Sequence, residues 1–217
     1  MRLLLARHGE STWNAEGRYQ GRLDAPLSPR GRAQAEALAA RLLREQSSNP
    51  PESRLVAIAS SPLPRARDTA QICGEALGLD VQVDERLTEI SHGEWEGKLR
   101  GEVAIRWPEM LAQWRTSPHL VQFPGGEMLE EVELRFLSFL HDLRQAQGPT
   151  LALTHDVIIR IASLRALGKE LCAFNEVHVD NAALDEFLVD GSKLDAVRLN
   201  DTTHLGSLRS DSRSQAL

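Results

Sequence analysis

Two short apolar runs that each end in a histidine constrain the fold of this chain most. The first runs from Leu3 to Ala6 and is followed by Arg7 and His8, and the second runs from Leu151 to Thr154 and is followed by His155. Runs of this length between polar turn residues are typical of buried strands. Ligands of an open α/β sheet bind beyond the carboxyl ends of its strands. We therefore expect both imidazoles to reach one crevice.

Strand and helix patterns alternate along the chain. The apolar spacing predicts further strands at 55–59 and 81–83 and a terminal hairpin over 184–199, and it predicts helices from 28 to about 46, at 64–77, at 127–147 and at 157–167. Such alternation indicates an α/β protein, a three-layer α/β/α sandwich with a mainly parallel central sheet. We expect a single domain over residues 1–205, followed by a Ser- and Arg-rich tail at 206–217 that is mobile.

Composition restricts the partners of the protein. The net charge of −6 disfavours nucleic acid and anionic membranes, because both require an excess of basic surface. No apolar stretch approaches the length that spans a bilayer, so no membrane association is expected. Cys73 and Cys172 lack the spacing of a metal cluster and suit a reducing compartment. These features predict a cytoplasmic protein, and they leave its oligomeric state open, a homodimer included.

The residues at the strand ends suit the chemistry of phosphate esters. Arg7, His8, the segment 60–65 and His155 should meet at one edge of the sheet, and Glu89 lies in a glycine-punctuated loop that could fold over it. Guanidinium and imidazole groups bind dianions, and a neutral imidazole is a competent nucleophile. Hydrolysis of phosphate monoesters requires up to ~10²¹-fold acceleration, whereas one general acid supplies ~10²–10⁴. A covalent step and several fixed cations are therefore expected.

Five sequence blocks follow one another in a fixed order. They are Arg7-His8-Gly9-Glu10 with Asn14, Gln20-Gly21 with Asp24, Ser60 to Ala66, Glu89 with Gly93-Glu94-Trp95-Glu96-Gly97, and Thr154-His155. Together they closely resemble the histidine phosphatase superfamily, the phosphoglycerate mutase-like group, from Met1 to about Leu205. One triplet would be a weak signal, but five ordered blocks in a strand context are a strong one.

The resemblance implies a role for each matched position. His8 is the expected nucleophile, which becomes phosphohistidine. Glu89 would protonate the leaving oxygen and then activate the water that hydrolyses the phosphohistidine. His155 is the third expected catalytic residue, beside His8 and Glu89. The phosphate is expected to bind at Arg7, Asn14, Gln20, Gly21 and Arg65. Such a mechanism requires neither a metal nor a cofactor.

The segment between Glu89 and Gly125 favours hydrolysis over mutase chemistry. A mutase must exclude water beneath a long lid, and this segment is shorter than the family's mutases usually carry. We expect a phosphomonoesterase that acts on a small phosphorylated metabolite, with a cofactor-dependent phosphoglycerate mutase as the alternative. His92 and His204 resemble positions that bind the amino acid in metal-independent phosphoserine phosphatases, so phosphoserine is a specific hypothesis.

Asp156 departs from the family pattern, since many relatives have glycine after the second histidine. A carboxylate there should repel the dianion unless it turns away to cap the following helix, and we expect the cap. His155-Asp156 also resembles the HD pair of metal phosphohydrolases, but His92, His119 and His141 do not supply the further ligands in that pattern. A non-catalytic binding module is another alternative, and the presence of every matched catalytic position argues against it.

Overall fold

A six-stranded sheet forms the centre of the molecule. The computed structural model describes every residue except 192, 211–214, 216 and 217. The sheet has the strand order β3-β2-β4-β1-β5-β6. Its strands are β1 (Arg2–Arg7), β2 (Ala57–Ser60), β3 (Val81–Val83), β4 (Thr150–Thr154), β5 (Leu184–Asp190) and β6 (Lys193–Asp201).

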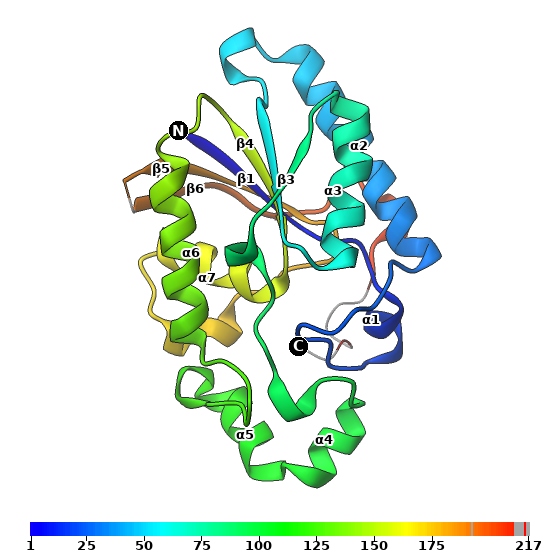
Figure 1. The fold of residues 1–217 in the computed structure, drawn as a ribbon, viewed down its shortest axis with the longest axis vertical. Coiled ribbons are helices and arrows are strands. Elements are labelled where there is room, and N and C mark those ends of the chain that lie inside the picture. The colour runs from blue at the N-terminus through cyan, green and yellow to red at the C-terminus, as the bar shows by residue number, and fades with distance from the viewer. Residues whose placement is uncertain (192, 211–214, 216–217) are drawn as a thin grey trace.

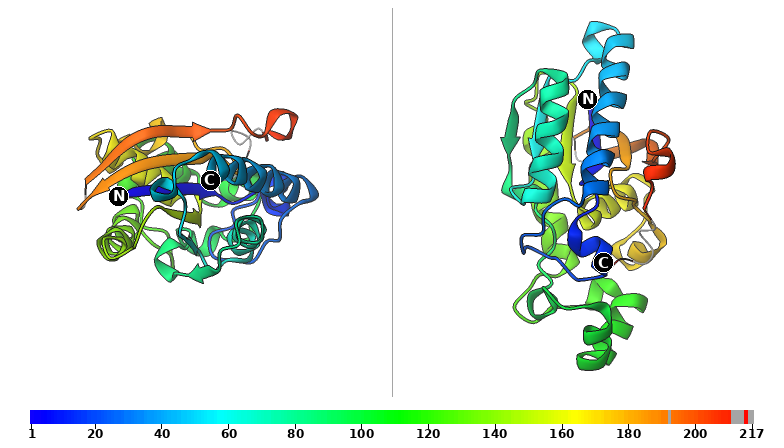
Figure 2. Two further views of the ribbon diagram at one scale, coloured as in Figure 1. Left: turned by 90° about the horizontal axis from the view of Figure 1, so that it is seen from above. Right: turned by 90° about the vertical axis from the view of Figure 1, so that its right-hand side faces the viewer.

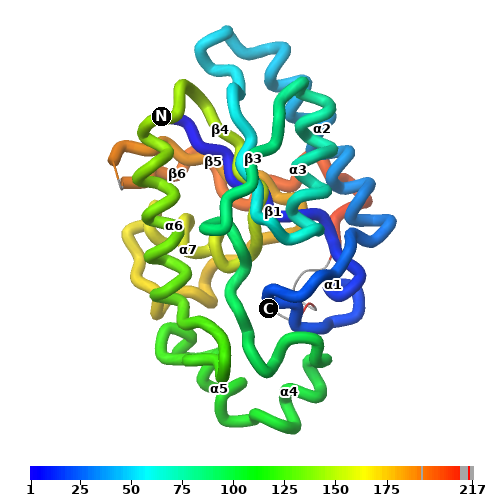
Figure 3. The backbone as a smooth tube through the Cα atoms, in the orientation of Figure 1, coloured from blue at the N-terminus to red at the C-terminus, as the bar shows by residue number. Residues whose placement is uncertain are grey.

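Helices cover both faces of this sheet (Figures 1 and 2). They are α1 (Thr12–Glu16), α2 (Pro29–Ser48), α3 (Pro64–Leu77), α4 (Arg100–Arg106), α5 (Pro108–Thr116), α6 (Leu129–Leu143) and α7 (Asp156–Ala166). Figure 3 shows α4 and α5 as one excursion of the chain beyond the sheet, between the loop after β3 and the start of α6. This excursion lies next to the end of the sheet from which β1 leads into α1 (Figure 1).

The alternation of side chains along β1 divides the core into two parts. Leu3 and Leu5 pack in a cluster with residues of α6 and α7, whereas Leu4 and Ala6 pack in a second cluster with residues of α2 and α3. All four side chains are buried. Successive residues of a strand point to opposite faces, so one apolar run supplies both cores. The three-layer α/β/α sandwich predicted from the sequence is confirmed.

Strand register brings the ends of β1, β2 and β4 side by side. β1 and β4 are parallel with Arg7 opposite Thr154, and β2 and β4 are parallel with Ser60 opposite Leu153. Residues that directly follow these strands therefore share one edge of the sheet. The other neighbour of β1 is β5, which runs antiparallel and forms the predicted hairpin with β6. The sheet is thus mainly parallel at its centre, with an antiparallel edge.

Most predicted elements occur close to their predicted bounds. β3 spans the predicted residues, while α6 is shorter than the predicted 127–147 helix because its last turn ends at Leu143. The sequence did not predict α1, α4 or α5, which are short helices that lack a long apolar repeat. No helix of the described residues is long and apolar enough to cross a membrane.

The predicted tail begins with a 3₁₀ turn at Gly206–Leu208. Ser210 Oγ accepts a hydrogen bond from Gln34 Nε2 at 2.7 Å, and the side chain of Gln215 is buried. The described part of the segment therefore packs against the protein. Residues 211–214, 216 and 217 of the tail, which we expected to be mobile, lie outside the described residues.

Candidate active site

Four buried basic side chains meet at the shared edge of the parallel strands. His8 directly follows β1 and His155 directly follows β4, and their ring centroids lie 5.1 Å apart. Arg65, at the start of α3, places its Nε 3.3 Å from His8 Nε2. Arg7, the last residue of β1, completes the group, and all four side chains are at most 1% exposed. The prediction that both imidazoles face one crevice agrees with this geometry.

The hydrogen bonds of His8 define which ring nitrogen is available. His8 Nδ1 lies 2.7 Å from the carbonyl oxygen of Gly9, and a carbonyl can only accept, so the proton is assigned to Nδ1. The lone pair is then on Nε2, in agreement with the N–H that Arg65 directs at it. Burial, helped by Arg65 and Arg7, lowers the pKa of His8 well below its usual value. His8 is therefore neutral, with a nucleophilic Nε2.

A serine sets the tautomer of His155. His155 Nε2 lies 2.7 Å from Ser61 Oγ, and Ser61 Oγ accepts a hydrogen bond from the backbone N–H of Leu63 at 3.3 Å. The Ser61 hydroxyl has no other acceptor for its proton in the described structure, so it is assigned as the donor to His155 Nε2, and the imidazole proton is assigned to Nδ1. Burial lowers the pKa of His155 well below its usual value. A neutral His155 therefore presents Nδ1–H as a donor.

Several buried donors at this edge have no partner among the described residues. They are Arg7 Nε, Asn14 Nδ2 and His155 Nδ1. The two terminal nitrogens of Arg7 are each held by one hydrogen bond, from Nη1 to Val179 O at 2.8 Å and from Nη2 to Gln215 Oε1 at 2.9 Å. Buried donors without acceptors are costly, and they occur where a ligand supplies the acceptors. Together with Arg65, they suit an anion with several oxygens.

Gln20 and Gly21 belong to the framework that supports these donors. Arg65 Nη2 donates to Gly21 O at 2.7 Å, and Arg65 Nη1 donates to Leu23 O at 3.0 Å. Gln20 Oε1 accepts a hydrogen bond from Ser11 Oγ at 2.6 Å. Burial lowers the pKa of Arg65 to about 10, so the guanidinium stays charged near neutral pH. In this structure Gln20 and Gly21 thus orient other groups of the site.

Glu89 is a buried carboxyl group with an unusual affinity for protons. Its segment is tied to the end of β4 by the hydrogen bond from Thr154 Oγ1 to Leu87 O at 2.6 Å. Burial is the main cause that raises the pKa of Glu89 to about 7, with a further contribution from Asp156 and an opposing one from Arg65. A carboxyl with this pKa can both donate and accept a proton near neutral pH.

Asp156 does not cap the helix that follows His155, so that prediction is wrong. The N-cap of α7 is His155, and Asp156 is the first residue of the helix. Its carboxylate instead forms a salt bridge with Arg160 Nε at 2.7 Å and a second with Arg7 Nη1 at 3.7 Å. Neither carboxylate oxygen has a hydrogen-bond partner in the described structure, so the attraction of two guanidinium charges, and not a cap on a backbone N–H, directs the side chain.

Comparison with known proteins identifies the family. The family model of the histidine phosphatase superfamily (branch 1) matches residues 3–202. The chain belongs to the histidine phosphatase superfamily. The resemblance drawn from the five sequence blocks is confirmed.

Several relatives of this chain are named as phosphatases. Phosphoserine phosphatase 1 of Hydrogenobacter thermophilus is 39% identical over 208 residues, which cover 95% of each protein. The structure of Bacillus stearothermophilus YhfR aligns with a TM-score of 0.85 at 30% identity and covers 94% of this chain and 98% of its own. A mycobacterial glucosyl-3-phosphoglycerate phosphatase, in complex with VO3, aligns with a TM-score of 0.82 at 29% identity and covers 93% and 99%. The predicted phosphomonoesterase activity is confirmed.

The two histidines associated with substrate choice differ in their surroundings. His92 is buried among Tyr19, Trp114 and Phe123, and neither of its ring nitrogens has a hydrogen-bond partner in the described structure. Burial lowers the pKa of His92 to about 3, so the ring is neutral. Both nitrogens of His204, in contrast, are engaged, by Arg41 Nη1 at 3.1 Å and by a backbone carbonyl at 3.0 Å.

Three residues that support the site were not singled out by the sequence analysis. Ser61 holds His155, Asn181 Nδ2 lies 3.4 Å from His8 O, and Gln215 bridges Asn181 and Arg7. Ser61 lies inside a matched sequence block, so a signal for it existed. Asn181 and Gln215 come from segments without a motif, and only the folded chain brings them to the strand ends.

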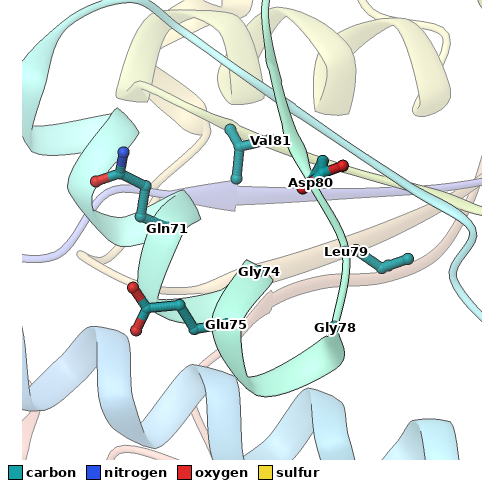
Figure 4. Close-up of a pocket in the computed structure, with 7 residues that line it drawn as sticks. All are labelled: Gln71, Gly74, Glu75, Gly78, Leu79, Asp80 and Val81. Carbon is teal, nitrogen blue, oxygen red and sulfur yellow. The ribbon is translucent and has the colours of Figure 1, made fainter.

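The surface depression shown in Figure 4 is separate from this site. It has a volume of about 510 Å³, and its lining runs from Gln71 in α3 through Gly78 to Val81 at the start of β3. Because α3 runs from the carboxyl edge of the sheet back to the amino edge, the depression lies at the edge opposite His8. It does not contain any of the predicted site residues.

Proposed function

We propose that this phosphatase transfers the phosphoryl group of a small phosphomonoester to Nε2 of His8 and then to water. One observation carries the proposal. A neutral, buried imidazole with its lone pair on Nε2, where it accepts from Arg65 at 3.3 Å, lies beside a set of buried donors that lack acceptors in the described structure. The three non-bridging oxygens of a phosphoryl group supply those acceptors.

In the first step, the substrate's phosphorus is attacked by His8 Nε2. Arg7 Nε, Asn14 Nδ2 and His155 Nδ1 donate to the phosphoryl oxygens and stabilise their charge, while the bond between phosphorus and the leaving oxygen breaks. The proton of Glu89 moves to that leaving oxygen, so the product departs as a neutral alcohol. The pKa of about 7 supports this role, because a large fraction of Glu89 is protonated near neutral pH.

In the second step, the phosphohistidine is hydrolysed. Glu89, now a carboxylate, takes a proton from a water molecule, and the resulting hydroxide attacks phosphorus as the bond to His8 Nε2 breaks. Arg65 Nε–H donates to His8 Nε2 at 3.3 Å in this structure, and it would turn to an oxygen of the phosphoryl group once the Nε2 lone pair bonds to phosphorus. Inorganic phosphate leaves and His8 returns to its neutral form. These steps use only side chains of the chain and do not require a metal or a cofactor.

Phosphoserine is the proposed substrate. A relative that is 39% identical carries the name phosphoserine phosphatase 1, and this supports the assignment. His92 supports it as well, because its two unpartnered ring nitrogens can exchange hydrogen bonds with the charged amino acid part of the substrate. His204 has both nitrogens occupied, so its contribution to binding would be through the backbone that it holds.

A cytoplasmic location, a single domain over residues 1–205 and a homodimer belong to the same proposal. Cys73 and Cys172 are both free thiols, which suits a reducing compartment. Large apolar side chains are exposed at Ile105 and Leu134, and a dimer could cover such residues. Light scattering on the purified protein measures the mass in solution, and a monomeric mass at micromolar concentration would contradict the dimer.

The proposed mechanism is tested by hydrolysis of para-nitrophenyl phosphate in EDTA. We expect His8→Ala to lose turnover and to form no acid-labile phosphoenzyme, while the wild type shows both. His141→Ala, which changes an exposed histidine of α6, is the matched control and should keep both. Turnover that survives His8→Ala, or that EDTA abolishes in the wild type, would contradict the mechanism.

The proposed substrate is tested at His92. His92→Ala should weaken phosphoserine turnover far more than turnover of para-nitrophenyl phosphate, which lacks the amino acid groups. His92→Phe is a second variant that keeps a ring in the aromatic cluster and removes only the nitrogens. Equal losses with both substrates in His92→Phe would rule out phosphoserine recognition by this side chain.

A further inference from the structure

Asp156 lies in an ion-pair chain directly behind the phosphate-binding residues. Its side chain is 1% exposed, and it stands between Arg160 and Arg7 at the start of α7. The guanidinium of Arg160 in turn stacks over the ring of Phe174, with its carbon 5.0 Å from the ring centroid. This series of contacts therefore leads from the ring of Phe174 through Arg160 and Asp156 to Arg7 at the phosphate site.

Helix stability alone does not account for a carboxylate at this position. An acidic residue in the first turn of a helix contributes ~0.3–1 kcal/mol. Burial of a carboxylate costs several kcal/mol, and only well-placed partners offset that cost. In the described structure the interactions of Asp156 that can offset this cost are its ion pairs with Arg160 and Arg7, since neither carboxylate oxygen has a hydrogen-bond partner there.

The contact with Arg7 points toward the phosphate. Arg7 Nη1 is shared between Val179 O at 2.8 Å and Asp156 Oδ1 at 3.7 Å, and Arg7 Nη2 is bonded to Gln215. Nε has no hydrogen-bond partner in the described structure. A planar guanidinium that is held at both terminal nitrogens has one orientation, so its Nε direction is set before substrate binds.

We propose that Asp156, paired with Arg160, is a positioning residue of this phosphatase: together with Val179 O and Gln215 its carboxylate holds the guanidinium of Arg7. It also places a fixed negative charge behind the phosphate site, next to the end of β4 to which the segment before Glu89 is bonded. The proposal rests on the proposed function of Glu89 as the acid for the leaving group. A carboxylate in this place has two opposite effects. It repels the phosphate dianion, and it also keeps the proton on the neighbouring acid.

The proton of Glu89 depends on the balance of charges around it. Asp156 raises the pKa of Glu89, while Arg65 and Arg7 lower it. The charged groups that interact with Glu89 are Arg7 at the end of β1, Arg65 of α3, Arg135 of α6 and Asp156 of α7, and Arg160 pairs with Asp156. Asp156 is the negative charge among these mostly basic groups. Its removal should therefore release the proton of Glu89 at lower pH.

Two charge-removing variants test this role because they act in opposite directions. Asp156→Asn removes the negative charge, and the alkaline limb of the kcat/KM profile for phosphoserine should move to lower pH by about one unit. Arg160→Gln removes the positive charge on the far side of Asp156, and the same limb should move by a smaller amount to higher pH. Asp142→Asn, an exposed carboxylate of α6 outside this group, should leave the limb unchanged.

If Asp156 and Arg160 only supported the fold, Asp156→Asn and Arg160→Gln would not shift the alkaline limb of the pH profile in opposite directions. Unmoved limbs, or shifts of the same sign in Asp156→Asn and Arg160→Gln, overturn the proposal. Asp156→Gly is the second variant if Asp156→Asn does not fold, and its limb should also move to lower pH. A limb in Asp156→Gly that does not move overturns the proposal equally.

The anchoring of Arg7 has its own readout. Inhibition by orthophosphate at pH 6, where Glu89 is largely protonated, should weaken several-fold in Asp156→Gly because Arg7 loses one of the three groups that hold its guanidinium. Tighter inhibition would show that Asp156 only repels the dianion and would overturn the anchoring. These outcomes differ from a failure of the proposed function, in which the His8→Ala variant would turn over substrate as fast as the wild type.

Discussion

Ser61 should control catalysis through the tautomer of His155. The Ser61→Ala variant removes the hydroxyl that lies 2.7 Å from His155 Nε2. Without it, the neutral imidazole can carry its proton on Nε2, and the lone pair on Nδ1 then faces the phosphoryl oxygens. The donor in the wild type thus becomes an acceptor that repels the substrate.

The size of the effect follows from the burial of both groups. Ser61 and His155 are fully buried, so water cannot replace the lost hydrogen bond. An unsatisfied buried polar group costs ~1–3 kcal/mol. If that cost falls on the transition state, kcat/KM decreases by about 5- to 150-fold, since 1.4 kcal/mol corresponds to a factor of ten. The free energy of unfolding should fall by a similar ~1–3 kcal/mol.

The assay compares kcat/KM of Ser61→Ala and Ser60→Ala with phosphoserine and para-nitrophenyl phosphate. Ser60 is the matched control because it is equally buried and its hydroxyl donates to Ser61 O at 2.9 Å without touching His155. Nitrogen-15 chemical shifts of His155 report the tautomer directly. An unchanged tautomer together with kcat/KM within twofold of the Ser60→Ala value would refute the reasoning.

Three further predictions concern acid catalysis and stability. Glu89→Gln should lower kcat/KM for phosphoserine by ~10²–10⁴-fold. Because Glu89 has a pKa of about 7 and must be protonated for the first step, wild-type kcat/KM should also fall about tenfold per pH unit above pH 7. A flat pH profile up to pH 9 would contradict this role. Arg65→Lys should lower the free energy of unfolding in urea by ~2–4 kcal/mol, because the buried carbonyls of Gly21 and Leu23 lose their donors, and an unchanged midpoint would argue against it. Burial raises the pKa of Asp185 to about 7, so the native state holds an extra proton between about pH 4 and 7 and loses stability as pH rises through that window. Asp185→Asn should therefore be ~1–2 kcal/mol more stable than wild type at pH 8 and show no such gain at pH 4 by thermal unfolding, and an equal gain at both values would disprove the cause.

Local sequence patterns predicted the parts of the site that are carried by strands. The apolar runs before His8 and His155 predict strands without reference to the rest of the chain, because alternating burial on two faces requires apolar side chains in succession. Parallel strands have their carboxyl ends at one edge, so the two histidines and Arg65 could be placed together in advance. The bounds of β3 and α3 were also predicted, since glycine and proline mark their ends.

Side-chain pairing across the fold could not be predicted in this way. Asp156 was expected to cap α7, and the sequence did not reveal that Arg7 and Arg160 both lie within reach of its carboxylate. The aromatic cluster around His92 assembles from segments far apart in the chain, so its ring nitrogens and low pKa had no local signal. The short helices α4 and α5 lack a long apolar repeat and were missed for the same reason.

The sequence alone therefore determined the chemistry of this protein, and the tertiary structure decided its protonation states. Residue types and their order supply a nucleophile, an acid and several cations, and these are properties of the side chains themselves. Which nitrogen of His8 or His155 carries a proton, and whether Glu89 holds one near neutral pH, depends on burial and on neighbours within a few ångströms. Those neighbours are separated by up to 94 residues in the case of Ser61 and His155, and only folding brings them into contact.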